Sequence, residues 1–174
     1  MTGEANKQDA LKLPVSRLEP RKVGGGRPAN GLLWQLHGPV PSSIVVDWDG
    51  VAYATYLDGT HAMNSFAIPR GRLLEGLLIS SEHLEFIVDV SSRYDPVRYT
   101  GPAGVLMLKA GKLHLMTVDF SDGFKDIKAI PLWGDYPSAG EEGAAAFSRW
   151  KLVTRNGEQE ITLWEFSGLQ PGAA

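Results

Sequence analysis

Five dipeptides that end in glycine divide the chain and limit what it can fold into. They are Asp49-Gly50, Asp58-Gly59, Ala110-Gly111, Asp122-Gly123 and Asn156-Gly157. Glycine, together with Asp or Asn, tolerates the positive φ angles that a two-residue hairpin turn requires. The segments around these dipeptides have strand length and are rich in β-branched and aromatic residues, for example SIVVDW and VAYATYL. The pattern therefore predicts antiparallel hairpins that follow one another along the chain.

The apolar segments predict about ten strands. The ranges are 32–37, 43–48, 51–57, 61–68, 72–79, 84–90, 104–109, 112–120, 125–133, 147–154 and 160–167. Residues 73–80 stay open between strand and helix, because their leucine spacing suits a helical turn after Pro69 whereas Gly76 disfavours a stable helix. The stretch GDYPSAGEEGAAAFS stays open between a loop with a short helix at 141–147 and a mobile lid.

The expected fold is all-β, with antiparallel strands in meander order. A chain of 174 residues suits one domain and can bury a continuous core. Short connections between successive strands favour a closed or flattened β-barrel, since closure removes exposed sheet edges. A two-sheet sandwich is the second choice.

The first 30 residues differ in composition from the remainder. They contain three prolines, a run of three glycines and few apolar residues, too little apolar surface to offset the entropy of ordering them. We therefore expect a flexible arm over 1–30 and a folded β-barrel domain over 31–174. An alternative stays open, in which the segment LKLPVSRLEPRKV lies extended along the domain or a partner, as such arms can add to a sheet edge.

Charge and composition exclude several classes of protein. The arm has six basic and three acidic side chains, so it carries +3 and the remaining residues carry −6. An acidic domain disfavours nucleic-acid binding. With no cysteine there is no disulfide or thiolate site, and no apolar run is long enough for a signal peptide or a membrane span. The expectation is a soluble cytoplasmic protein that binds no membrane.

The hairpin turns predict which side chains share a face of the sheet. A two-residue turn at Asp49-Gly50 places Trp48, Tyr53 and Thr55 on one face, and a second such turn at Asp58-Gly59 adds Asn64 to it. The turn at Asn156-Gly157 predicts three opposed pairs, with Trp164 on the solvent side near Arg149. The pairs are Arg155 with Glu158, Leu152 with Ile161, and Trp150 with Leu163.

No motif in the sequence predicts a metal or cofactor site. The four histidines include no His-x-His pair, and a catalytic metal needs three protein ligands. Asp119 is an acid within the apolar segment LHLMTVDF. It is either a functional carboxylate or, as is more usual, an acid at a strand end that contacts water or caps the following turn.

The aromatic residues suggest a function. A barrel lined with aromatic side chains and a few polar groups can enclose a small apolar or aromatic ligand. One wall would contain Trp48, Tyr53, Thr55 and Asn64, and another Trp150 and Leu163. Such a protein would be a carrier or a cofactor-independent enzyme, isomerase-like or cyclase-like, that acts by orienting its substrate. The alternative is a protein-binding module, such as an inhibitor, an immunity factor or a small subunit, with a packed interior and a protein partner or a homodimer.

Overall fold

The computed structural model describes residues 17–35, 42–95, 102–119, 126–134 and 144–168. These residues form fourteen strands and two short 3₁₀ turns, η2 (Ser81–His83) and η3 (Val90–Ser92), and the described ranges contain no α-helix. The all-β class is therefore confirmed. The strands are β1 (Glu19–Gly24), β2 (Gly31–Gln35), β3 (Ser43–Trp48), β4 (Val51–Tyr56), β5 (Asn64–Ala67), β6 (Leu73–Ser80), β7 (Leu84–Val88), β8 (Arg93–Tyr94), β9 (Leu106–Lys109), β10 (Lys112–Asp119), β11 (Asp126–Pro131), β12 (Ala145–Phe147), β13 (Trp150–Asn156) and β14 (Gln159–Phe166).

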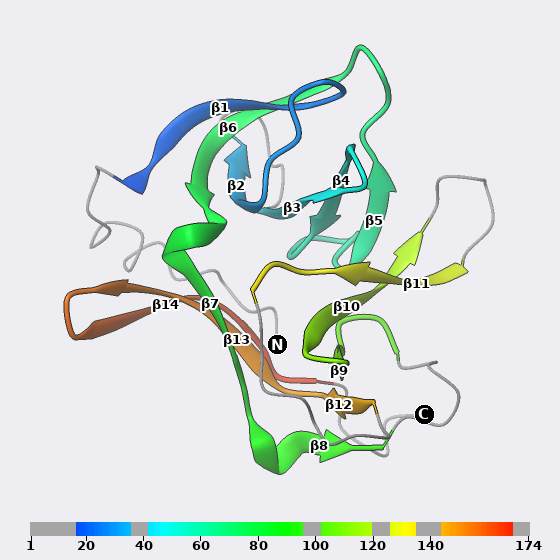
Figure 1. Ribbon diagram of the computed structural model, residues 1–174, viewed down its shortest axis with the longest axis vertical. Helices are drawn as coiled ribbons and strands as arrows, with labels where there is room; N and C mark the ends of the chain where they lie inside the picture. The colour runs from blue at the N-terminus through cyan, green and yellow to red at the C-terminus, as the bar shows by residue number, and fades with distance from the viewer. Residues whose placement is uncertain (1–16, 36–41, 96–101, 120–125, 135–143, 169–174) are drawn as a thin grey trace.

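The strands form two sheets rather than one closed barrel (Figure 1). The large sheet has the order β1-β6-β2-β3-β4-β5-β10-β9-β12-β8, with β11 paired to β10, and the small sheet has the order β14-β13-β7. Within the described ranges, β1 and β8 at the ends of this path pair with no further strand. The predicted barrel is therefore wrong. The chain leaves the large sheet at η2, and β7 then pairs with the distant β13, so the meander is interrupted before it can close.

Apolar side chains cover both faces of the central strands. A main core joins the two sheets and includes Ile44 and Leu115 from the large sheet with Phe86 and Leu152 from the small one. A second core on the other face of the large sheet is built by residues such as Val45, contributed by β1, β2, β3, β4 and β6. This arrangement resembles a sandwich with an additional apolar layer, and it explains why neither face of these strands is polar in sequence.

The structure answers the question left open for residues 73–80, which form strand β6. This strand lies between β1 and β2 and pairs antiparallel with both. A Cβ atom on Gly76 would lie 2.1 Å from the carbonyl oxygen of Trp34, so only glycine allows β2 and β6 to approach this closely. The glycine that disfavours a helix is thus required by the sheet.

Two of the predicted hairpin turns are confirmed. Asp49 and Gly50 both have positive φ, 53° and 76°, and the register pairs Trp48 with Val51 and Val46 with Tyr53 as expected. The Ala110-Gly111 turn also joins paired strands, β9 and β10. Asp122-Gly123 lies outside the described residues.

The Asp58-Gly59 connection is longer than expected, and the face predicted for Asn64 is wrong. Met63 adopts a φ of 64° and its N–H donates to the carbonyl of Tyr56, so the return strand begins only at Asn64. Thr55 then lies opposite Ser65, and Ala54 opposite Phe66. Asn64 consequently shares a face with Phe66 and not with Tyr53.

The Asn156-Gly157 hairpin has the predicted strands but a different register. Asn156 pairs with Gln159 and Arg155 with Glu160, and a bulge after Leu152 places Trp164 opposite that residue. The three predicted pairs are therefore wrong, because the turn lies at Gly157-Glu158 and the bulge shifts the strands further. Burial of Trp150, Leu152 and Ile161 is confirmed. Arg149 forms an ion pair of 2.9 Å with Asp89 in β7–η3 rather than a contact with Trp164.

Part of the segment expected to be a flexible arm forms a strand in the structure. Residues 19–24 form β1, which pairs with β6 along its whole length, and Val23 is fully buried in the second core. The extended alternative therefore describes this segment, which adds to the edge of the protein's own sheet. Residues 145–147 form strand β12, and among the described residues no helix is long and apolar enough to cross a membrane.

Candidate functional site

The structure separates the five residues predicted to bind a ligand. Trp48 and Tyr53 lie together on the main-core face, with ring centroids 5.4 Å apart at 45°. Thr55 is buried further along the same face of β4. Asn64 lies on the opposite face, where its amide is 3.3 Å from His61 Nδ1. The buried indole of Trp150 donates to the carbonyl of Gly104 at 2.7 Å within the aromatic part of the main core.

Lys128 on β11, which sequence reasoning missed, completes a cluster with Trp48 and Tyr53. Its Nζ lies 5.5 Å from the Trp48 ring centroid and 5.0 Å from that of Tyr53. It donates to Asp119 Oδ2 at 2.9 Å and to the Tyr53 hydroxyl at 3.4 Å. The hydrogen bond to Asp119 is the main cause that raises the pKa of Lys128 above its ordinary value. Lys128 therefore stays protonated at neutral pH.

Two buried hydroxyls lie behind this cation. Ser65 Oγ and Thr117 Oγ1 are 2.7 Å apart, and the Thr117 hydroxyl donates to the carbonyl of Lys128 at 3.2 Å. Both residues are buried, so neither hydroxyl can reach a substrate. The Lys128 cluster therefore holds a positive charge against two aromatic faces.

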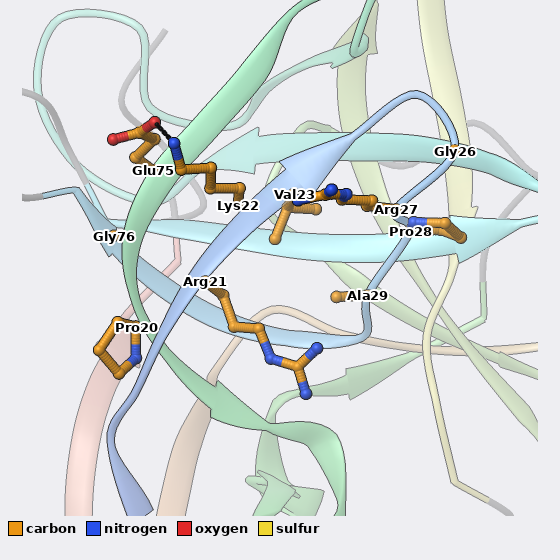
Figure 2. Close-up of a pocket in the computed structure, with 10 residues that line it drawn as sticks. All are labelled: Pro20, Arg21, Lys22, Val23, Gly26, Arg27, Pro28, Ala29, Glu75 and Gly76. Atoms are coloured by element: carbon orange, nitrogen blue, oxygen red, sulfur yellow. Dashed lines mark ion pairs between the residues drawn. The ribbon is translucent and has the colours of Figure 1, made fainter.

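A surface groove lies at the other end of the large sheet, along strand β1 (Figure 2). Its volume is about 700 Å³, and none of the five predicted ligand residues lines it. In Figure 2 the Arg27 side chain extends back toward Val23 on β1, the Arg21 side chain extends toward the side of Ala29, and Lys22 turns toward Glu75. The lining residues are Pro20, Arg21, Lys22, Val23, Gly26, Arg27, Pro28, Ala29, Glu75 and Gly76.

The main chain of β1 is open on the side of this groove. Gly24 exchanges two hydrogen bonds with Arg27, N–H to carbonyl in both directions at 3.1 and 2.9 Å, so its polar groups point away from β6. Alternate residues of an antiparallel strand point their N–H and C=O groups to the same side. The groups of Lys22 and the carbonyl of Pro20 therefore also point into the groove. Outside the ladder to β6, the Lys22 N–H donates to no main-chain carbonyl of the described residues.

The groove is basic. Arg21 pairs with Glu19 at 3.2 Å and Lys22 pairs with Glu75 at 2.6 Å, each between side chains that are about half exposed. Among the residues that the structure describes, Arg27 has no ion-pair partner. Exposed ion pairs contribute only about 0–1 kcal/mol, so the two paired cations can exchange partners at little cost.

The described residues hold no group of three His, Asp or Glu side chains arranged to bind a metal ion. No curated protein and no solved structure matches the chain. A family model described as "Uncharacterised protein y4lG" matches residues 28–173, which covers most of the chain and nearly all of its strands. The chain therefore belongs to the y4lG family.

Proposed function

We propose that the protein is a protein-binding module that engages its partner through the groove along β1. The observation that carries this proposal is the open main-chain edge of β1 beside that groove. Unpaired N–H and C=O groups in a row are complementary to another extended polypeptide, which can add as a strand.

The alternative of an enclosed small ligand has less support. The residues expected to line a cavity lie in separate places, with Asn64 across the sheet from Tyr53 and Trp150 packed against Phe86 and Phe166. Small-ligand sites are concave and bury most of the ligand surface. Side chains from both sheets fill the main core of the described residues, and the groove lies outside it.

A photo-cross-linking experiment in the protein's own host tests the proposal. p-Benzoylphenylalanine replaces Pro28 in the groove, or Glu158 in the β13–β14 turn as the control position, because both residues are exposed. We expect the variant with the probe at position 28 to form an adduct with one protein of defined mass, and the control variant not to form it. An absence of adducts at position 28, or the same adducts from both positions, would contradict the proposal.

A further inference from the structure

We propose that the groove binds an extended acidic segment of the partner, which adds as a strand to the free edge of β1. This inference rests on the proposed function and specifies what the partner presents. Two independent features carry it: the direction of the main-chain groups in β1 and the charge of the side chains around them.

The main-chain argument begins at the two hydrogen bonds between Gly24 and Arg27. They form the first step of an antiparallel ladder on the outer side of β1. The protein's own chain does not extend this ladder, because Gly24 and Arg27 form an isolated bridge and the chain then leaves toward β2. The next positions on β1 are left with the Lys22 N–H and C=O and the Pro20 carbonyl facing the groove. A second strand is the ligand that satisfies this alternating set of groups.

The charge argument selects an acidic strand. Arg21 and Arg27 lie on the two sides of the groove, and Lys22 lies at its edge with one carboxylate, Glu75, among the lining residues. Residues 31–174 carry a net charge of −6, so this basic surface is local to β1 and the turn that follows it. Guanidinium groups bind carboxylates through paired, charge-assisted hydrogen bonds, and a basic partner would be repelled.

Binding of model peptides tests both features directly. The probe is a fluorescein-labelled peptide of about eight residues with alternating Glu and Thr, followed by fluorescence anisotropy. Three matched probes accompany it: the same peptide with N-methyl groups on alternate residues, the Lys/Thr peptide, and a thymidine oligonucleotide of similar charge. We expect the acidic peptide to bind, the N-methylated peptide to bind at least about tenfold more weakly, and the Lys/Thr peptide and the oligonucleotide not to bind.

Substitutions at Lys22 separate the main-chain contact from the charge. Lys22→Pro removes the outward N–H but leaves the ladder to β6 intact, since an edge strand tolerates proline at an outward position, as Pro20 already shows. Lys22→Ala removes the ammonium and keeps the N–H, so it is the matched control. We expect Lys22→Pro to weaken peptide binding about tenfold relative to Lys22→Ala, and Arg27→Ala to weaken it severalfold. Unchanged circular-dichroism melting curves establish that the variants are folded.

Four results would overturn the inference. The first is no binding of the acidic peptide at concentrations up to about 1 mM, and the second is equal binding of the N-methylated peptide. The third is oligonucleotide binding as tight as peptide binding. The fourth is a dimer in sedimentation that Lys22→Pro dissociates, which would show that a second copy of the chain covers the edge of β1. Failure here is distinguishable from failure of the proposed function. If the probe at position 28 captures a partner while the acidic peptide does not bind, the protein-binding function stands and the acidic-strand inference is wrong.

Discussion

Replacing Lys128 by methionine should lower the free energy of unfolding by about 2 kcal/mol, between the value for an exposed pair and that for a broken buried pair. Methionine keeps an unbranched apolar stem against Trp48 and Tyr53 but removes the ammonium. The Asp119 side chain is only 11% exposed, so it would lose a cation 2.9 Å away in a poorly hydrated place. At that distance the direct attraction is about 6 kcal/mol at an effective dielectric constant of about 20. Desolvation of both groups offsets most of it, and the 32% exposure of Lys128 lets water screen the remainder.

A double-mutant cycle with Asp119→Asn measures this interaction, with urea unfolding followed by tryptophan fluorescence at pH 7. We expect the Lys128→Met/Asp119→Asn variant to lose at least about 1 kcal/mol less than the two single losses together, because it no longer contains a carboxylate that has lost the Lys128 cation. Because the pKa of Lys128 is raised in the folded protein, its contribution to the free energy of unfolding is complete at neutral pH. This contribution is lost only at strongly alkaline pH, as the pH rises through the folded-state pKa. Additive losses within about 0.5 kcal/mol would refute the reasoning.

The remaining predictions concern one histidine and one glycine. Burial lowers the pKa of His114, and neighbouring Lys109 acts in the same direction, so the unfolded chain takes up a proton near pH 6.5 that the folded protein resists. The urea concentration at the unfolding midpoint should therefore decrease as the pH is lowered from 7 to 5 in the wild type, and it should decrease less in His114→Gln. An identical decrease in both proteins would contradict the assignment of this pH dependence to His114. Gly76→Ala should destabilise the protein by more than about 2 kcal/mol, since the new Cβ meets the Trp34 carbonyl, whereas Glu75→Ala on the same strand should cost less than about 1 kcal/mol. Similar thermal midpoints for these two variants would show that β2 and β6 can move apart.

Local turn chemistry explains how much of the fold the sequence could predict. At Asp49-Gly50 both turn positions suit positive φ, and the register of β3 and β4 follows from that turn alone. At Asp58-Gly59 the deciding residue is Met63, whose positive φ no propensity predicts. The pairing of β7 with β13 joins residues 62 to 70 positions apart, and no local pattern records such a contact.

The same limit applies to the candidate sites. Trp48 and Tyr53 could be placed together because one short turn relates them, whereas Lys128 reaches them only through the pairing of β11 with β10 across residues 120–125. The β1 groove could not be predicted from composition, because the prolines and glycines of residues 1–30 are as typical of a flexible arm as of a strand at the edge of a sheet. The cytoplasmic location and the homodimer stay predictions.

Burial of the central strands on both faces changes what holds them in alignment. In a sheet with one wet face, a slip of one residue exposes the whole apolar side to water, so the hydrophobic pattern itself keeps the strands in register. In β2, β3 and β4 the same slip would move apolar side chains from one buried face of the sheet to the other, so it would expose little apolar surface to water. The strand register in this protein therefore depends on two points of close geometry, the Asp49-Gly50 turn and the contact between Gly76 and Trp34. In most sheets the exposure of apolar side chains to water fixes the register instead.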